Sequence, residues 1–133
     1  MPQHIEVVGA VIVRDGSVLC AQRGPSAALP YLWEFPGGKV EPDESPRDAL
    51  EREISEELRC RVRVGDQVER TTYAYDFATI TLTTYYCELV GGEPQPTEHA
   101  EVRWVAPQDL EDLDWAPADV PAVARIQLDL ADG

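Results

Sequence analysis

The amino-acid sequence predicts a single layered α/β domain in which helices cover a mixed β-sheet. The chain has 133 residues, of which 44% are hydrophobic, and this is enough for one ordinary hydrophobic core. Segments rich in β-branched and aromatic residues are intermixed with two stretches of helical spacing. There is no repeat and no low-complexity tract. We therefore expect one domain, 1–133, with one functional site.

The first part of the chain predicts a β-hairpin. Apolar residues dominate both sides of Asp15-Gly16 within residues 5–21, and Asp-Gly is a strong signal for a tight hairpin turn. Residues 24–30 are expected to form a loop and residues 33–35 a short strand, which ends at the break Pro36-Gly37-Gly38.

A helix is predicted from residue 46 to about residue 58. Ser45 is a favourable N-cap, Pro46 suits the first helical position, and Asp48 completes a pattern that resembles a capping box. Apolar residues recur every four positions along one side of this helix, as expected of a face packed on the core. They are Leu50, Ile54 and Leu58.

The second half of the chain is expected to be mainly strand. Its β-branched and aromatic residues predict three strands, at residues 62–70, 72–77 and 79–89. Gly91-Gly92-Glu93-Pro94 ends the third of these. A further short strand at 102–105 and a terminal helix at 120–130 complete the predicted elements.

The charge limits the classes of partner. A formal net charge of −14 argues against a surface that binds the phosphate backbone of DNA or RNA. If the ligand is nevertheless polyanionic, divalent cations must mediate its binding. No stretch offers the roughly 18 or more apolar residues of a membrane span, and the N-terminus lacks a basic region followed by an apolar run, so we expect a soluble cytoplasmic protein.

The cysteines give no sign of a disulfide framework or a zinc site. Cys20, Cys60 and Cys87 are odd in number, widely spaced and set among apolar residues. Free cysteine is among the residues most often buried, so we expect three buried thiols.

The predicted helix 46–58 carries a crowded group of acids. Glu53, Glu56 and Glu57 occupy positions i, i+3 and i+4, which places three carboxylates within one turn. A solvated acidic face is the alternative interpretation. However, the acids lie in the C-terminal half of the helix, where the helix dipole disfavours negative charge. Oxygen ligands on one rigid turn suit a hard cation such as Mg²⁺, which keeps several waters and accepts substrate phosphates.

A glycine-containing loop at residues 37–44 directly precedes this helix. Its glycines let the backbone approach a ligand closely, although a simple turn would also explain them. The combined pattern is Gly38, five residues, Glu44, seven residues, and then Arg52-Glu53-Ile54-Ser55-Glu56-Glu57-Leu58. This pattern resembles the Nudix box of the Nudix hydrolase superfamily.

The resemblance implies an α/β/α sandwich and an enzyme that hydrolyses a nucleoside diphosphate linked to another group. It also implies that Mg²⁺, or alternatively Mn²⁺, is held by the carbonyl of Gly37 or Gly38 and by three acids, namely Glu53, Glu56 and Glu57. Arg52 and Glu44 would orient these ligands. An ordinary helical ion pair between Arg52 and Glu56 is the alternative.

The sequence departs from the family pattern at the end of the box. Arg59 stands where the family usually has a glycine that caps the helix in a left-handed conformation. If Arg59 adopts the same dihedral angles, the cost is about 1 kcal/mol. Because no metal ligand is removed, we expect activity to survive.

The resemblance extends beyond the box to the MutT branch. Residues 21–23, 32–41 and 115–119 are similar to the corresponding stretches of 8-oxo-dGTP diphosphatases and CTP pyrophosphohydrolases. This implies cleavage of a nucleoside triphosphate to a monophosphate and pyrophosphate. By the same resemblance Arg23 and Lys39 would hold phosphates, although either could be a surface cation.

Glu98 matches a position where MutT enzymes have another glutamate that binds metal or activates water, although an isolated acid in a loop is usually solvated. For the neighbouring His99 we expect an exposed side chain without a catalytic role. The residue that deprotonates water stays open among Glu53, Glu57 and Glu98.

Asp119 falls where MutT proteins have an asparagine that reads the base. An ionised carboxylate there would suit the exocyclic amine of cytosine, whereas a protonated group could serve a purine. The alternative is an N-cap of the terminal helix. Aromatic and apolar residues could supply a stacking wall, although core packing explains them equally well. They are Phe35, Tyr73, Tyr75, Phe77 and Ile80, of which Tyr73, Tyr75 and Phe77 are expected to alternate onto one strand face.

The resemblance therefore predicts a monomeric or homodimeric enzyme that cleans the nucleotide pool, acting on (d)CTP, 5-methyl-dCTP or 8-oxo-dGTP. A Nudix enzyme for a nucleotide sugar or a dinucleotide is the alternative within the class. A non-catalytic Nudix domain that binds a ligand or a partner is the alternative outside it.

Overall fold

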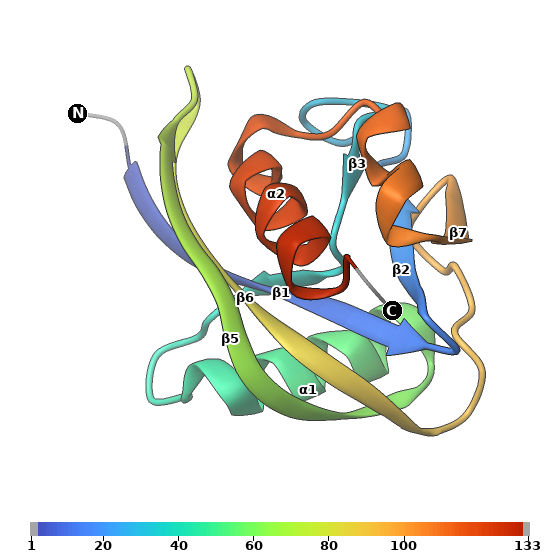
Figure 1. Ribbon diagram of the computed structural model, residues 1–133. Helices are drawn as coiled ribbons and strands as arrows, with labels where there is room; N and C mark the ends of the chain where they lie inside the picture. The colour runs from blue at the N-terminus through green and yellow to red at the C-terminus, as the bar shows by residue number, and fades with distance from the viewer. Residues whose placement is uncertain (1–2, 132–133) are drawn as a thin grey trace.

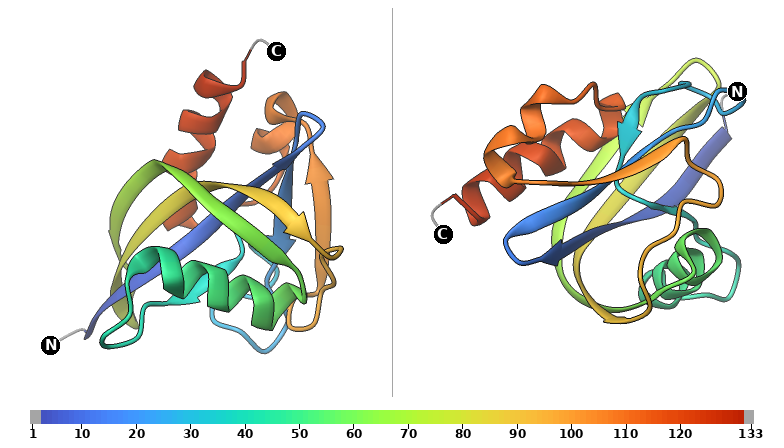
Figure 2. Two further views of the ribbon diagram at one scale, coloured as in Figure 1. Left: turned by 90° about the horizontal axis from the view of Figure 1, so that it is seen from below. Right: turned by 90° about the vertical axis from the view of Figure 1, so that its right-hand side faces the viewer.

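The computed structural model describes residues 3–131. A mixed seven-stranded sheet lies between two helices, one on each face (Figures 1 and 2). The α/β/α arrangement implied by the sequence resemblance is confirmed. The strands are β1 (Gln3–Arg14), β2 (Ser17–Gln22), β3 (Trp33–Glu34), β4 (Gly37–Lys39), β5 (Arg61–Ala74), β6 (Ala78–Gly91) and β7 (Glu101–Val105). The helices are α1 (Pro46–Leu58) and α2 (Val120–Asp129), with two 3-10 turns, η1 (Pro107–Asp112) and η2 (Pro117–Asp119).

The main path of the sheet runs β3-β2-β1-β6-β5, with β4 paired to β1 and β7 paired to β2. The pairing of β1 with β6 is parallel and the other pairings are antiparallel, so the sheet is mixed, as predicted. The predicted hairpin is confirmed. Asp15 and Gly16 have φ angles of 51° and 80°, as a two-residue hairpin turn of the favoured hand requires.

Two predicted boundaries are wrong. The strands expected at 62–70 and 72–77 form the single strand β5, and the turn to β6 lies at residues 75–77. Register shifts between Val64 and Gln67 and between Gln67 and Glu69 interrupt the alternation of side chains along β5. The pairing with β6 is nevertheless regular from Arg70 to Ala74, so one strand continues across residue 71, where the break was expected.

The glycines predicted to break the chain after β3 form the short strand β4 instead. Gly37 pairs with Gly9, and Gly38 pairs with Val8. A Cβ atom at Gly37 would overlap the backbone carbonyl of Val8, so glycine is needed for the close approach of β4 to β1. Gly37, which suggested a break after β3 in the sequence, thus permits the pairing of β4 with β1.

The two faces of the sheet carry separate parts of the core. On β1, Ala10 and Ile12 pack in the cluster that contains α1, whereas Val11 packs in the cluster that contains α2. The predicted apolar ridge of α1 is fully buried: Leu50, Ile54 and Leu58 each have 0% exposure. The three cysteines are free and buried, as expected, and burial raises the pKa values of Cys20 and Cys87 to about 12.

Helix α1 begins and ends as the sequence predicts. The side chain of Ser45 accepts a hydrogen bond from the amide of Asp48, with 3.1 Å between the two atoms. Arg59 keeps the left-handed conformation of the usual glycine, with φ 56° and ψ 34°, and its amide donates to the carbonyl of Ser55. The side chains of the helix are therefore presented without distortion at its end.

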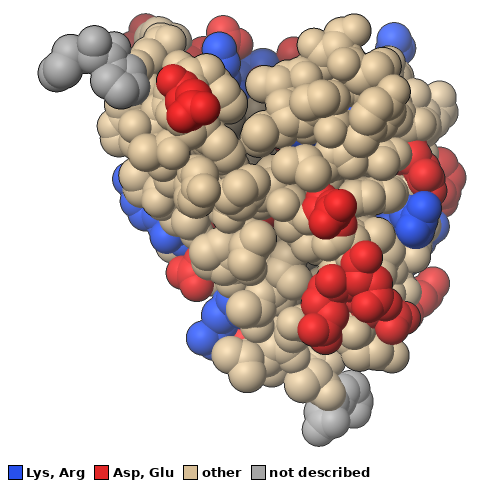
Figure 3. Space-filling view, turned by 90° about the horizontal axis from the view of Figure 1, so that it is seen from above, with Lys and Arg blue, Asp and Glu red and all other residues tan. Residues whose placement is uncertain are grey.

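The surface reflects the negative charge of the sequence. On the face shown in Figure 3, acidic side chains gather in a dense patch while basic side chains lie towards the margins. Within residues 3–131, no helix is both long and apolar enough to cross a membrane.

Candidate active site

One cavity of about 460 Å³ brings together residues from distant parts of the chain. We call the part lined by Glu57 of α1 and Glu98 of the loop after β6 the acid end. We call the part lined by Tyr75 and Phe77 of the β5–β6 turn and by Ala118 and Asp119 of η2 the base end. The predicted site residues that line the cavity are Arg23, Phe35, Gly37, Gly38, Lys39, Glu57, Tyr75, Ile80, Glu98 and Asp119.

Glu57 is the most unusual residue of the acid end. Its side chain is buried, and one of its oxygens, Oε1, has no hydrogen-bond partner among the described residues. Burial, assisted by a hydrogen bond to Glu53 and by the charge of Glu53, raises the pKa of Glu57 to about 9. A buried carboxyl group with a free oxygen beside a second carboxylate is an arrangement that a cation would stabilise.

Glu53 lies directly against strand β4. A Cβ atom added to Gly38 would overlap the carboxylate of Glu53, so this carboxylate occupies space that only a glycine leaves free. The helix and the glycine strand are thus fitted to each other. Gly38 and Glu57 line the acid end, and Glu53, which does not line the cavity itself, lies against both of them.

Arg52 holds the acids of the loop and the helix together. Its Nε and Nη2 atoms donate to the two carboxylate oxygens of Glu44, at 2.7 and 2.9 Å. Its Nη1 atom donates to Glu53 at 3.2 Å and to Glu56 at 3.2 Å. The hydrogen bonds from Arg52 lower the pKa of Glu44 to about 2. The two interpretations of Arg52, as an orienting residue and as the ion-pair partner of Glu56, therefore hold at the same time.

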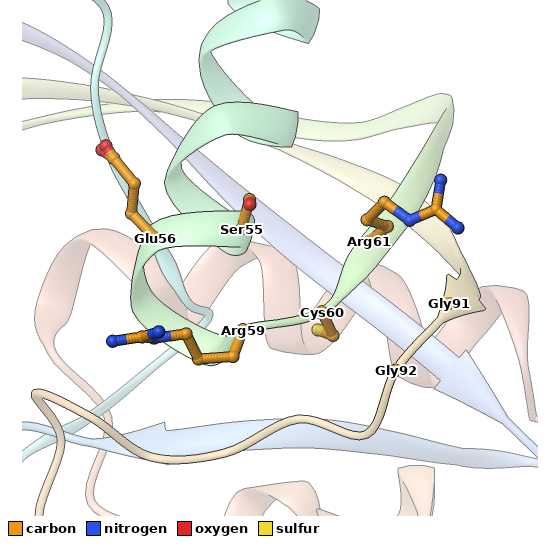
Figure 4. A pocket seen from close by; sticks show the side chains of 7 residues that line it. All are labelled: Ser55, Glu56, Arg59, Cys60, Arg61, Gly91 and Gly92. Carbon is orange, nitrogen blue, oxygen red and sulfur yellow. The ribbon is translucent and has the colours of Figure 1, made fainter.

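Glu56 shares Arg52 with Glu53 but faces a different part of the surface. It does not line the cavity but borders a second, open hollow of about 740 Å³ beside Arg59 and Arg61. In Figure 4 the side chain of Glu56 points away from this hollow, and the two guanidinium groups point in opposite directions. Among residues 3–131, no three His, Cys, Asp or Glu side chains are already gathered around a common point where a metal ion would sit. Mg²⁺ does not require such a cage, because it commonly keeps several waters.

Asp119 dominates the base end. Its side chain is almost fully buried, with 5% exposure of the residue, and its Oδ1 accepts a hydrogen bond of 3.1 Å from the amide of Phe35. It makes no side-chain cap of α2, so the N-cap interpretation is wrong. Burial, followed by the charge of Glu34, raises the pKa of Asp119 well above its usual range. The raised pKa favours the protonated form of this carboxyl group over the ionised form.

The aromatic residues of the base end differ in position. Tyr75, Phe77 and Ile80 line the cavity together with Phe35, whose ring lies 4.7 Å from that of Trp115. Tyr73 does not line the cavity, and its ring contacts Tyr75 from outside with centroids 4.6 Å apart. The predicted common strand face fails because β5 ends at Ala74, which places Tyr75 and Phe77 in the turn.

Two residues of the cavity were not predicted as site residues. Glu34 receives hydrogen bonds on both carboxylate oxygens, from Arg23 at 2.5 Å and from His99 at 3.0 Å. The side chain of His99 is only 6% exposed, so the expectation of an exposed histidine is wrong. The sequence signal for Glu34 was an acid between two aromatic residues of a short strand. For His99 only its position next to Glu98 could have pointed to the site.

The two predicted phosphate-binding cations, Arg23 and Lys39, differ in whether other groups of the protein bind them. Arg23 lines the cavity, but its guanidinium group also binds Glu34 and the carbonyl oxygen of Ala28. Lys39 lies at the rim of the same cavity and forms no ion pair within the described residues.

Comparison with known proteins identifies the family. The model of the NUDIX domain matches residues 3–126. The chain belongs to the Nudix family. It is 43% identical over 117 residues to the CTP pyrophosphohydrolase of Escherichia coli K12, a match that covers 88% of this chain and 87% of the relative. It is also 29% identical over 120 residues to the 8-oxo-dGTP diphosphatase of the same strain, covering 90% and 93%.

Solved structures agree with this assignment. The solution structure of the MutT protein of methicillin-resistant Staphylococcus aureus 252, described as a Nudix hydrolase, matches with a TM-score of 0.80 and 50% identity, covering 97% of this chain and 99% of that one. This Nudix protein is a MutT-like hydrolase of phosphoric anhydride bonds. Its Nudix box corresponds to β4, the loop that follows it, and α1.

Proposed function

We propose that this Nudix hydrolase uses Mg²⁺ to cleave a nucleoside triphosphate into a nucleoside monophosphate and pyrophosphate. The observation that carries the proposal is the cavity itself, which joins a buried acid end to an aromatic end with one buried hydrogen-bonding carboxyl group. Such a cavity accepts a ligand with phosphates at one end and a base at the other. The substrates that fit the relatives' names are (d)CTP, including 5-methyl-dCTP, and 8-oxo-dGTP, whose removal would clean the nucleotide pool.

The residues at the acid end suit a hard divalent cation. They offer only oxygen donors, and the unpaired Oε1 of Glu57 is a buried polar atom that lacks a partner among the described residues. We assign Glu53 and Glu57 as principal ligands, with Glu56, Glu98 and a backbone carbonyl of Gly37 or Gly38 completing the predicted set. Mg²⁺, or Mn²⁺ in its place, would supply neutralisation of phosphate charge and a lowered pKa for a water molecule.

The protein side chains then have distinct tasks. Arg52, itself held by Glu44, fixes the carboxylate of Glu53 against β4. Lys39 and Arg23 lie where they can bind phosphate oxygens. The proton of the attacking water passes to one of the three acids of this end, namely Glu53, Glu57 or Glu98. The net charge of −14 fits this division, because a polyphosphate then reaches the protein through cations.

The experiment is an assay of pyrophosphate release in the presence of Mg²⁺. The panel contains dCTP, CTP, 5-methyl-dCTP, 8-oxo-dGTP, dGTP and ADP-ribose, with inorganic phosphate measured in parallel. We expect pyrophosphate from at least one triphosphate and no activity when EDTA removes the metal. Turnover of ADP-ribose alone would replace the proposal with a hydrolase of nucleoside diphosphate derivatives. No turnover of any member would contradict the proposal and favour a Nudix domain that binds its ligand without cleaving it.

A further inference from the structure

The hydroxyl group of Tyr75 connects two segments of the base end. Tyr75 is the first residue after β5, and its hydroxyl oxygen accepts a hydrogen bond of 2.8 Å from the amide of Ala118. Ala118 lies in η2, directly before Asp119. The first amides of a helical turn have no partner within the turn, so this hydroxyl satisfies one of them. The position of Asp119 is thereby tied to the β5–β6 turn.

The geometry leaves the hydroxyl hydrogen of Tyr75 available. Because the oxygen accepts from Ala118, its own hydrogen must point elsewhere. Within residues 3–131 the side chain of Tyr75 makes no second hydrogen bond, and the residue lines the cavity. Burial raises the pKa of Tyr75, so the hydroxyl stays protonated at neutral pH. Tyr75 therefore presents an O–H donor at the base end.

Asp119 offers a second donor beside it. Its Oδ1 is occupied by the amide of Phe35, which can only donate, so a proton on this carboxyl group belongs on Oδ2. Both Asp119 and Tyr75 line the cavity, and the Tyr75 hydroxyl binds the amide of Ala118, the residue directly before Asp119. The cavity wall at this point carries two O–H donors.

We propose that Tyr75 is a specificity-determining residue, which fixes the Asp119 segment through its hydroxyl oxygen and donates its hydroxyl hydrogen to the base. Together with the carboxyl group of Asp119 it selects a base edge that has two adjacent acceptors. This inference rests on the proposed function, and it names the base. Cytosine presents N3 and O2 as adjacent acceptors, whereas uracil carries a hydrogen on N3. Ordinary guanine presents O6 and N7 as neighbouring acceptors, but guanine oxidised at C8 carries a hydrogen on N7, so its O6 no longer has an adjacent acceptor.

The test measures binding of nucleoside monophosphates, so it does not depend on catalysis. Isothermal titration compares dCMP, dUMP and deoxyribose 5-phosphate on the wild-type protein and on Tyr75→Phe. Tyr31→Phe is the matched control, because Tyr31 is 54% exposed and lies outside the cavity. We expect the wild type to bind dCMP more tightly than dUMP. We expect Tyr75→Phe to lose about tenfold in dCMP affinity, equal to about 1.4 kcal/mol, without loss for deoxyribose 5-phosphate.

Three results would overturn the proposal. The first is a wild type that binds dUMP as tightly as dCMP, or binds neither. The second is an unchanged dCMP affinity in Tyr75→Phe. The third is an equal loss for deoxyribose 5-phosphate, which would indicate a purely structural role for the tyrosine. A wild type that hydrolyses no triphosphate, yet shows the expected dCMP pattern, would contradict the proposed function and support the inference.

Discussion

The acid end and the base end of the cavity each contain a buried carboxyl group with a raised pKa, but their surroundings differ. Glu57 lies beside Glu53 and has an oxygen without a partner among the described residues, whereas Asp119 is hydrogen-bonded to the backbone amide of Phe35. Burial is the main cause of the raised pKa in both. We expect the neighbouring groups to determine whether each carboxyl group binds a cation or donates a hydrogen bond.

At the acid end, the crowded negative charges make the proton on Glu57 easy to replace by a cation. At the base end, Asp119 accepts a hydrogen bond from a backbone amide on one oxygen, and burial raises its pKa, which favours the protonated form that can donate. We therefore expect the same desolvation to prepare a metal ligand in one place and a neutral hydrogen-bond donor in the other.

The largest expected effect is at the acid end. Glu53→Gln removes a carboxylate charge while keeping the shape of the side chain. Metal ions stabilise the transition state by several kcal/mol, so we expect pyrophosphate release to fall about 1000-fold. Glu51→Gln on the exposed side of the same helix is the control and should keep wild-type turnover. Full turnover by Glu53→Gln with unchanged metal affinity would remove Glu53 from the mechanism.

A smaller loss is expected from moving Glu53 rather than neutralising it. Gly38→Ala places a methyl group in the space of the Glu53 carboxylate. A displacement of about 1 Å in a catalytic group costs about 100-fold in rate, and we expect kcat to fall by this order. In the control Gly24→Ala the new methyl group would lie 3.5 Å from the carbonyl oxygen of Glu98, an ordinary contact distance. Equal kcat values for the two variants would show that the fit of β4 to Glu53 is unimportant.

The two ends also differ in how Mg²⁺ should change the pH dependence of the stability of the folded protein. The pKa of Glu57 is raised from 4.5 to about 9, so the folded protein holds a proton that the unfolded chain releases, and stability without metal falls as pH rises from about 4.5 to 9. Because Mg²⁺ binds the ionised carboxylate, its stabilisation should grow over the same interval, to about 2.7 kcal/mol at 100 times its Kd.

Thermal unfolding with and without Mg²⁺, at several pH values, measures this effect. The variant Glu57→Gln should lose most of the Mg²⁺ stabilisation, and Asp119→Asn should keep it. A Mg²⁺ effect that is independent of pH in the wild type would contradict the assignment of Glu57 as a ligand.

The acid end was largely predictable from the sequence, because its residues lie within one short segment. Helical spacing places Glu53 and Glu57 on one turn, and the capping pattern fixes where that helix begins. The contact of Gly38 with Glu53 follows from the same segment folding back on itself. The structure was required to show that Glu57 lines the cavity whereas Glu53 and Glu56 do not.

The base end was less predictable, because its contacts join residues far apart in the chain. Local sequence suggested that Asp119 caps a helix, but its actual partner is the amide of Phe35. The contacts of Glu34 with His99 and of Tyr75 with Ala118 have no local signal. Strand β5 also ends at Ala74, which places Tyr75 in the turn, and the periodicity of the sequence did not reveal this end.

The smallest expected effect concerns the protonation of Asp119. In Asp119→Asn the amide oxygen can accept from Phe35 while the NH₂ group donates to the base, which reproduces the neutral carboxyl group. We therefore expect the dCMP affinity to change by less than about threefold at neutral pH. Asp119→Ala provides the contrast, because it removes the donor and leaves the amide of Phe35 without its partner.

The pH profile sharpens this prediction. Burial raises the pKa of Asp119, which favours the protonated donor, and this donor is lost when rising pH ionises the group. Affinity of the wild type for dCMP should therefore fall at alkaline pH, while that of Asp119→Asn should stay constant over the same range. A large loss of dCMP affinity in Asp119→Asn at neutral pH would mean that the carboxylate is ionised there and accepts from the exocyclic amine, which would make the two ends of the cavity alike in charge.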